Sequence, residues 1–200
     1  MDGVIQRKEQ SMRTLYYSPN SRSDTVVALV RMLDADIEMR EVRIARQDGA
    51  GSPDPANPHP EGKVPYLSDG DVAVRERGAI MLYLTDAYPD AGLGPLPGEA
   101  RRGAYLSWLS YYQGVIEPLL ILKWANVSHP AITAGLRDFD TMIERLAEPL
   151  RKGPWLLGER FSAADMLCSS PFFWFTDMMP ADPAIRDWVA RCAKRMGDGK

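Results

Sequence analysis

Apolar and β-branched residues occur in two short runs near residue 70, and this pattern predicts a hairpin followed by a helix. The runs cover residues 64–67 and 72–74, with Asp69-Gly70 between them. Asp-Gly between two strand-like runs indicates a tight turn, because both central residues of the favoured turn need positive φ. Helical spacing of apolar residues then predicts a helix over residues 76–88, which ends at Pro89.

The chain upstream of this hairpin predicts a strand, a helix and a second strand. Residues 12–17 have strand character, and residues 37–44 predict a second strand of uncertain register. Between them, apolar residues follow the i, i+3, i+4, i+7 spacing of a helix: Val26, Leu29, Val30 and Leu33. Residues 45–60 are rich in Gly, Pro and Asp and predict a loop over a site. The order β-α-β-loop-β-β-α is the thioredoxin-like arrangement.

Downstream of residue 98 the pattern predicts helices only. A Gly/Pro-rich linker at residues 91–98 suggests a domain boundary, which gives domains at 12–90 and 98–200. The expected fold class is α/β plus all-α, with a thioredoxin-like domain followed by an all-helical domain. The predicted helices include one that kinks near Glu117, one continuous helix over residues 132–150, and a last helix over residues 185–196. Ser162 and Asp165 have the spacing of a capping box.

Composition excludes several classes of function. The chain has 200 residues, 45% of them hydrophobic, which is enough to form a core. A formal net charge of -3 and a pI near 5.5 argue against nucleic acid as a partner. Two cysteines far apart and two histidines provide neither a disulfide framework nor a metal site.

The sequence also predicts a protein without membrane contacts. Residues 1–11 lack the apolar core of a secretory signal and are expected to form a mobile extension. Since no apolar run approaches membrane-spanning length, a cytoplasmic location is expected.

Two motifs resemble the glutathione S-transferase family. They are NPHPEGKVPYL at residues 57–67 and, after an acidic residue, AIMLYL at residues 79–84. The similarity extends over nearly the whole chain from Met12, and the capping box also resembles the family. The resemblance implies a homodimer that takes glutathione as co-substrate and joins its thiol to a hydrophobic small-molecule electrophile.

The resemblance also implies a binding site for glutathione. If the Val64–Pro65 bond is cis, the N–H and C=O of Val64 turn outward and pair with the cysteinyl backbone of glutathione. The N-terminus of the following helix suits the γ-glutamyl carboxylate, and Glu76 suits the ammonium group. Lys63 and His59 are expected to meet the glycyl carboxylate.

The thiol is expected to lie at the turn after the first strand. There the family carries a Tyr, Ser or Cys, and Ser21 matches the serine of zeta-like members, so Ser21 is the expected catalytic residue. Ser23, Ser18, Asn20 and Tyr17 are alternatives, with Ser23 also a candidate for glutathione binding. Arg22 matches the cysteine of beta-like members and would stabilise a thiolate by charge alone. The expected electrophile pocket is lined by Tyr17, Tyr111, Tyr112 and Trp124.

Two departures from the family pattern favour other functions. The family usually has a hydroxyl residue after the acidic one, whereas this chain has Glu76-Arg77, and Arg77 binds the carboxylate only if its side chain is aimed inward. The first turn also lacks a cysteine, which removes thiol–disulfide exchange on a protein thiol. The alternatives are therefore a non-catalytic binding or scaffold protein of the same fold, or a glutathione-dependent isomerase or dehalogenase.

Each site residue also has a structural alternative. Ser21 and Ser23 are ordinary helix-capping residues, and Glu76 suits the helix dipole. His59 and Lys63 have the character of solvated loop residues. The aromatic residues lie at helical spacing, which is typical of a core.

Overall fold

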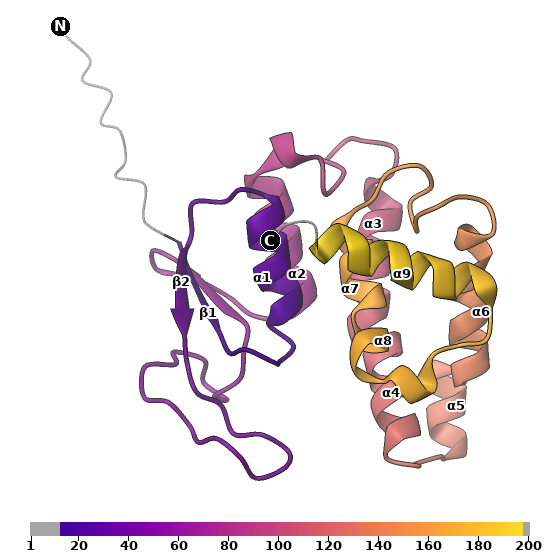
Figure 1. The fold of residues 1–200 in the computed structure, drawn as a ribbon, viewed down its shortest axis with the longest axis horizontal. Coiled ribbons are helices and arrows are strands. Elements are labelled where there is room, and N and C mark those ends of the chain that lie inside the picture. Colours follow the sequence, from indigo (N-terminus) through magenta and orange to yellow (C-terminus); the bar gives the residue numbers. More distant parts are fainter. Residues whose placement is uncertain (1–12, 198–200) are drawn as a thin grey trace, which may run out of the picture.

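A four-stranded mixed sheet forms the first domain of the computed structural model, which describes residues 13–197 (Figure 1). The strands are β1 (Thr14–Tyr17), β2 (Glu38–Glu41), β3 (Tyr66–Asp69) and β4 (Val72–Val74), in the order β2-β1-β3-β4. β1 pairs with β2 in parallel and with β3 antiparallel. The predicted extension at residues 1–11 lies outside the described residues.

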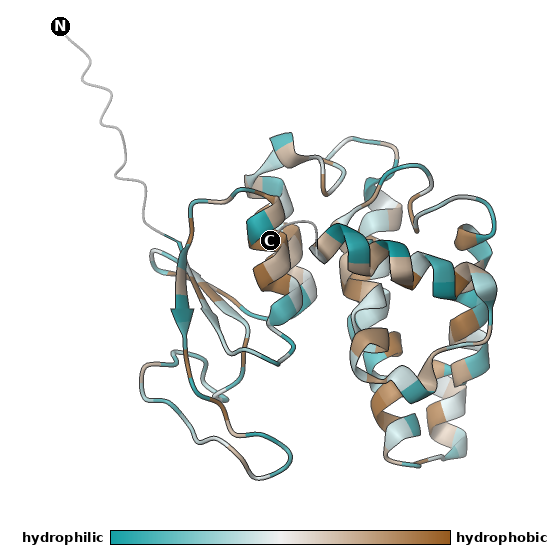
Figure 2. Ribbon diagram, viewed as in Figure 1, coloured by the Kyte–Doolittle hydropathy of each residue, from teal (hydrophilic) through white to brown (hydrophobic). Residues whose placement is uncertain are grey.

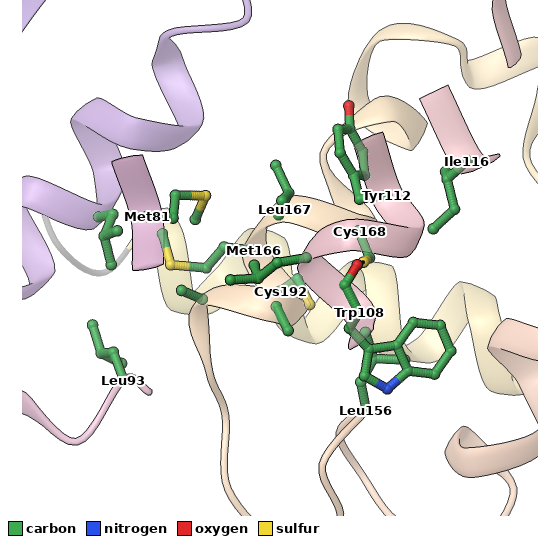
Figure 3. Packing of buried hydrophobic residues seen from close by; sticks show 14 of the residues in the cluster. Met81, Leu93, Trp108, Tyr112, Ile116, Leu156, Met166, Leu167, Cys168 and Cys192 are labelled. Carbon is green, nitrogen blue, oxygen red and sulfur yellow. The ribbon is translucent and has the colours of Figure 1, made fainter. Parts of the chain in front are cut away.

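Two helices separate the sheet from the second domain (Figure 1). Helix α1 (Asp24–Met32) and helix α2 (Arg77–Ala87) contact each other, and both contact helix α7 (Ala163–Ser169) of the second domain. The predicted apolar stripe of α1 is buried, and Val26 and Leu29 are completely inaccessible. Figure 3 shows Met81 of α2 and Met166 of α7 in the same packed region, where both are 0% exposed. The two domains therefore share one apolar core.

The second domain consists of helices in the part of the chain that the structure describes. They are α3 (Arg102–Tyr111), α4 (Glu117–Trp124), α5 (Pro130–Leu136), α6 (Phe139–Leu150), α7, α8 (Pro171–Trp174) and α9 (Pro183–Gly197). Short 3-10 turns lie at Pro89–Ala91 and Thr176–Met178, and a π turn lies at Tyr112–Ile116. Along α9, hydrophilic and hydrophobic positions alternate, as Figure 2 shows, and the buried ones are Ile185, Trp188, Val189 and Cys192. The predicted fold class is confirmed; the exact domain boundaries stay a prediction.

The predicted capping box forms at the start of α7. The Asp165 carboxylate accepts hydrogen bonds from the backbone N–H and the hydroxyl of Ser162, each at 3.0 Å. It also accepts the Leu156 N–H at 2.8 Å and the Trp188 indole N–H at 2.9 Å. Asp165 is 0% exposed, so this carboxylate joins α7, α9 and the preceding loop inside the core.

The strand predictions were correct in number and order but not in their limits. β3 begins after Pro65, and β2 covers only four residues. On β2 the core contacts come from the flanking Ile37 and Val42, while Met39 is 37% exposed, which gives the register that the sequence left uncertain. In the hairpin, Asp69 pairs with Val72, so the turn residues are Gly70 and Asp71. Of these only Gly70 has positive φ, at 59°. A type II′ turn, which is also common in tight hairpins, needs positive φ only at its first central residue, here Gly70.

Two helix predictions were wrong in detail, and the irregularity predicted near Glu117 takes the form of a π turn. The helix predicted over residues 132–150 is two helices, because Arg137 at φ 67° ends α5 and the Asp138 side chain accepts the Thr141 N–H to start α6. The kink predicted near Glu117 is a π turn. Pro118 has no N–H to donate back along the helix, which favours a wider turn immediately before it. Glu76 lies outside α2, at φ 68°.

No helix within residues 13–197 is long and apolar enough to cross a membrane. The long segment between β2 and β3 contains neither helix nor strand, as the Gly- and Pro-rich composition predicts.

Candidate functional site

Two cavities meet between the sheet domain and the helical domain. The smaller, of about 310 Å³, is called the polar pocket, and the larger, of about 550 Å³, is called the aromatic cleft. Both are lined by Arg22, Lys63, Val64, Arg77 and Glu117. The polar pocket adds His59, Pro65, Glu76 and Gln113. The cleft adds residues 20–21, 44–47 and 62 of the sheet domain together with Tyr112, Leu120, Ile121, Trp124, 170–171 and 174–175 of the helical domain.

Val64 lies where the two cavities meet. The Val64–Pro65 peptide bond is cis, which is the condition on which the predicted binding edge depends. β3 begins only at Tyr66, and within residues 13–197 the Val64 N–H and C=O have no backbone partner. Backbone groups of this kind can pair with an extended peptide.

The polar pocket contains an acidic group at the start of α2. Glu76 is the residue before the first turn of this 11-residue helix, and its carboxylate accepts a hydrogen bond from the Gln113 amide at 3.0 Å. Gln113 comes from the helical domain, so both domains contribute to this pocket. Arg77, the first residue of the helix, also lines this pocket, and a helix start favours anions, so the pocket combines an acceptor for a cation with a place for an anion.

His59 also lines the polar pocket. Its Nδ1 accepts the Glu61 N–H at 3.1 Å, which leaves Nε2 as the protonated donor of the neutral ring. Burial lowers the pKa of His59, so the neutral form dominates at neutral pH. A neutral ring with Nε2–H can donate to a carboxylate, as the predicted role requires. Lys63 lies beside it and pairs with Glu61 at 2.6 Å.

Arg77 is directed toward the helical domain. Its guanidinium donates to Glu117 at 2.9 Å and to the Ser170 hydroxyl at 3.3 Å, and it also binds the Tyr112 hydroxyl. The guanidinium carbon lies 4.8 Å from the centre of the Tyr112 ring, and Arg77 is only 6% exposed. Arg77 therefore closes the inner wall of both cavities and is already paired with a carboxylate.

Glu117 connects the two domains electrostatically. Its carboxylate also accepts a hydrogen bond from Nε of Arg22, which belongs to the turn after β1. Burial opposes ionisation of Glu117, but the Arg77 and Arg22 guanidinium groups lower its pKa, and the net direction is downward. The Arg22–Glu117–Arg77 bridge therefore holds an ionised carboxylate at the point where the cavities meet.

The hydroxyl of Ser21 is used within its own turn. Ser21 Oγ lies 2.7 Å from the Ser18 carbonyl and 2.7 Å from Ser23 Oγ, and it accepts the Ser23 N–H. Ser23 is 0% exposed and lines neither cavity. Its hydroxyl accepts a hydrogen bond from the Ser18 N–H and donates one to the Ser18 carbonyl. The expectation that Ser23 caps α1 through its side chain was also wrong. Ser21 does line the cleft, but its single hydroxyl proton is already used in a hydrogen bond within the turn.

Two of the four predicted pocket aromatics line the cleft. Tyr112 forms part of the floor, and Trp124 is a wall residue that is 58% exposed. Tyr17 and Tyr111 are absent from both cavities and were wrongly predicted. Tyr111 turns to the other side of the helix, where it packs against Trp108 and the Arg145 guanidinium, and Tyr17 packs against the sheet-domain core.

Several site residues were missed by reasoning from sequence. They are Gln113, Glu117, Arg46 and Trp174. For Glu117 a signal existed, because the interruption of the helix at Gly114 and Pro118 predicted an irregular turn there, and π turns are frequent at functional sites. Gln113 lies inside this π turn and shares the signal, whereas Arg46 and Trp174 carry no local signal.

The cysteines lie away from both cavities. Cys168 and Cys192 are fully buried and unpaired, and burial raises the pKa of both thiols. Neither can serve as an exposed thiolate nucleophile.

Comparisons with known proteins agree with this geometry. Residues 14–94 match the family model "Glutathione S-transferase, N-terminal domain", and residues 130–191 match "Glutathione S-transferase, C-terminal domain". The disulfide-bond oxidoreductase YfcG of Escherichia coli is 25% identical over 205 residues, which cover 94% of each chain.

Solved structures are similar over nearly the full length. A glutathione transferase from Methylococcus capsulatus gives a TM-score of 0.73 at 27% identity, covering 94% of this chain and 98% of that one. A sphingomonad glutathione S-transferase, solved in complex with glutathione, gives 0.74 at 26% identity and covers 93% of this chain and 96% of that one.

Proposed function

Because the chain belongs to the glutathione S-transferase family, we propose that it binds glutathione in the polar pocket and joins its thiol to an electrophile held in the aromatic cleft. The main evidence for this proposal is the position of Val64. Its unpaired backbone lies where the two cavities meet, so a cysteinyl residue paired with it has its sulfur at the entrance to the cleft.

The charges of the polar pocket match those of glutathione. Glu76 offers a partner to the γ-glutamyl ammonium, and the start of α2 offers N–H donors to the carboxylate beside it. His59 Nε2–H and Lys63 are available to the glycyl carboxylate. Arg77 is placed to support this site as a buried cation paired with Glu117.

Catalysis in this proposal consists of holding the thiol as a thiolate beside the electrophile. The sulfur attacks the electrophilic atom, a carbon–sulfur bond forms, and the leaving group departs with its electron pair. Ser21 is the residue expected from the sequence. Arg22 has the stronger geometry, since it lines both cavities and its charge favours the thiolate form.

Two variants distinguish these residues. Arg22→Gln is expected to lower kcat/KM for conjugation by about tenfold and to raise the pKa of the bound thiol, because one charge-assisted contact to the sulfur is lost. Ser21→Ala is expected to change kcat/KM by less than about threefold, since its proton is used within the turn. The measurement is the initial rate against pH, with binding of reduced glutathione followed by isothermal titration.

Arg43→Gln is the matched control for Arg22→Gln. Arg43 pairs with Asp54 at 3.5 Å and lines neither cavity, and its loss changes the net charge equally. If Ser21→Ala abolishes activity while Arg22→Gln does not, Ser21 has the catalytic role. If wild type fails to bind glutathione, the proposed function is wrong and a scaffold role is favoured.

Glutathione-dependent reduction of disulfides is a second candidate. The full-length similarity to an enzyme named as a disulfide-bond oxidoreductase favours it. A bound glutathione thiolate can attack a disulfide sulfur, forming a mixed disulfide and releasing a thiolate, so the chemistry requires no protein cysteine. Turnover of a small dialkyl disulfide that exceeds turnover of carbon electrophiles would establish this function.

We also propose that the protein is a homodimer in the cytoplasm, on the family relationship. Light scattering during size-exclusion chromatography tests the dimer, and a mass of about 22.3 kDa would contradict it.

A further inference from the structure

We propose that the second substrate in the aromatic cleft is an aromatic carboxylate, and that Arg46 binds its negative charge. This inference rests on the proposed transferase function and specifies its electrophile. Among residues 13–197, four cationic side chains line the cleft, Arg22, Arg46, Lys63 and Arg77, but only one acidic side chain, Glu117. The cleft is therefore cationic in a chain whose formal net charge is -3.

Arg46 is held rigidly at the cleft wall. Its guanidinium donates to the carbonyls of Asn20 and Pro19, each at 2.7 Å, and lies 3.4 Å from the Ser18 hydroxyl. Its own backbone N–H donates to Ala50 at 2.9 Å, which fixes the loop that carries it. The charge is thus presented on a preorganised group, so an anion that binds it does not have to order a long side chain.

Arg46 forms no ion pair with a carboxylate among residues 13–197, and Asp24 interacts with its charge only at longer range. Among residues 13–197 every other cleft cation has a carboxylate partner, with Arg22 and Arg77 sharing Glu117 and Lys63 paired with Glu61. Arg46 contacts only neutral oxygens there. Since it lines the cleft and not the polar pocket, it faces the second substrate.

The opposite wall of the cleft provides flat apolar surfaces. Trp124 from the end of α4 and Trp174 from the end of α8 are 58% and 52% exposed, and Ile121, which also lines the cleft, is 40% exposed. Large exposed aromatic side chains in a cavity favour an aromatic ligand, which they can contact face to edge or in offset stacking. Arg46 on one wall and the two tryptophans on the other suit a ligand with a ring and an anionic group.

A chloronitrobenzoate and its methyl ester provide a matched pair of probes, because they differ chiefly in charge. The glutathione thiolate attacks the ring carbon that carries chlorine, the carbon–sulfur bond forms, and chloride leaves with the bonding electrons. We expect wild type to prefer the acid over the ester in kcat/KM. Arg46→Gln is expected to reduce that preference by about tenfold, the size of one charge-assisted hydrogen bond, without changing the KM for glutathione.

Two variants and a binding measurement complete the test. Arg46→Lys keeps the charge and should retain part of the preference, while Arg43→Gln should leave it unchanged. Binding of the two thioether products, with and without the carboxylate, is measured by titration and needs no turnover.

The outcomes separate the two levels of the proposal. An equal preference for acid and ester in wild type, in both rate and product binding, overturns the aromatic carboxylate. A raised KM for glutathione in Arg46→Gln with an unchanged acid preference assigns Arg46 to glutathione instead and also overturns it. If the protein binds neither glutathione nor either product, the proposed function fails together with the inference.

Discussion

Replacing Asp165 by alanine is expected to lower the free energy of unfolding by about 4 kcal/mol, which is among the largest effects of a single substitution. The carboxylate is 0% exposed and accepts four hydrogen bonds from Leu156, Ser162 and Trp188. Its removal leaves these donors without partners in the core and opens a cavity at the start of α7. Urea denaturation followed by circular dichroism gives the difference.

Asp138→Ala is the matched control for this substitution. Asp138 also caps a helix, accepting the Thr141 N–H at 2.7 Å, but it is exposed. Water can replace its hydrogen bond, so a loss of about 1 kcal/mol is expected. Equal losses in the two variants would mean that burial adds nothing to the capping interaction, contrary to this prediction.

The elements around Val64 and Asp165 were predictable because their signals are local. The strand–turn–strand–helix order depends on residues adjacent in sequence, and the capping box spans only four positions. The break at Arg137 was missed, because the apolar spacing continues through both helices. Each of the two helices packs an apolar face against the core, so both show the same spacing. Periodicity alone therefore does not detect the break between them.

The site itself depends on contacts that have no local signal. The Arg22–Glu117 hydrogen bond joins residues 95 positions apart, and the direction of Arg77 is decided by Glu117 and Tyr112. Tyr111 and Tyr112 are neighbours in sequence, yet a helix turns them to different sides, so only Tyr112 reaches the cleft. The family resemblance therefore predicted a glutathione site, but the sequence did not show which side chains line the two cavities.

Glu117→Gln is expected to lower the free energy of unfolding by about 3 kcal/mol, because it leaves the buried Arg77 charge without a carboxylate. Arg77 is 6% exposed and donates to Glu117 at 2.9 Å. The Arg22 side chain is 56% exposed, so its own contact with Glu117 contributes at most about 1 kcal/mol. Urea denaturation of the variant and wild type measures the loss.

The double variant Glu117→Leu/Arg77→Met tests the origin of this loss. When both charges are replaced by apolar side chains, no buried charge is left unpaired, and much of the stability lost in Glu117→Gln should return. If the stability loss of the double variant equals the sum of the losses in its two single variants, Arg77 and Glu117 act independently. The ion pair between them would then contribute no coupling energy to folding.

The pH dependence gives a separate test of the same bridge. The pKa of Glu117 is lowered in the folded protein from its ordinary value of 4.5, so the stabilisation is complete above that value and is lost as the pH falls through the folded pKa. A protonated Glu117 resembles glutamine in shape and charge. The difference in unfolding free energy between wild type and Glu117→Gln should therefore shrink as the pH falls below 4.5. A difference that stays constant with pH would mean that packing of the side chain, and not its charge, holds the two domains together at this point.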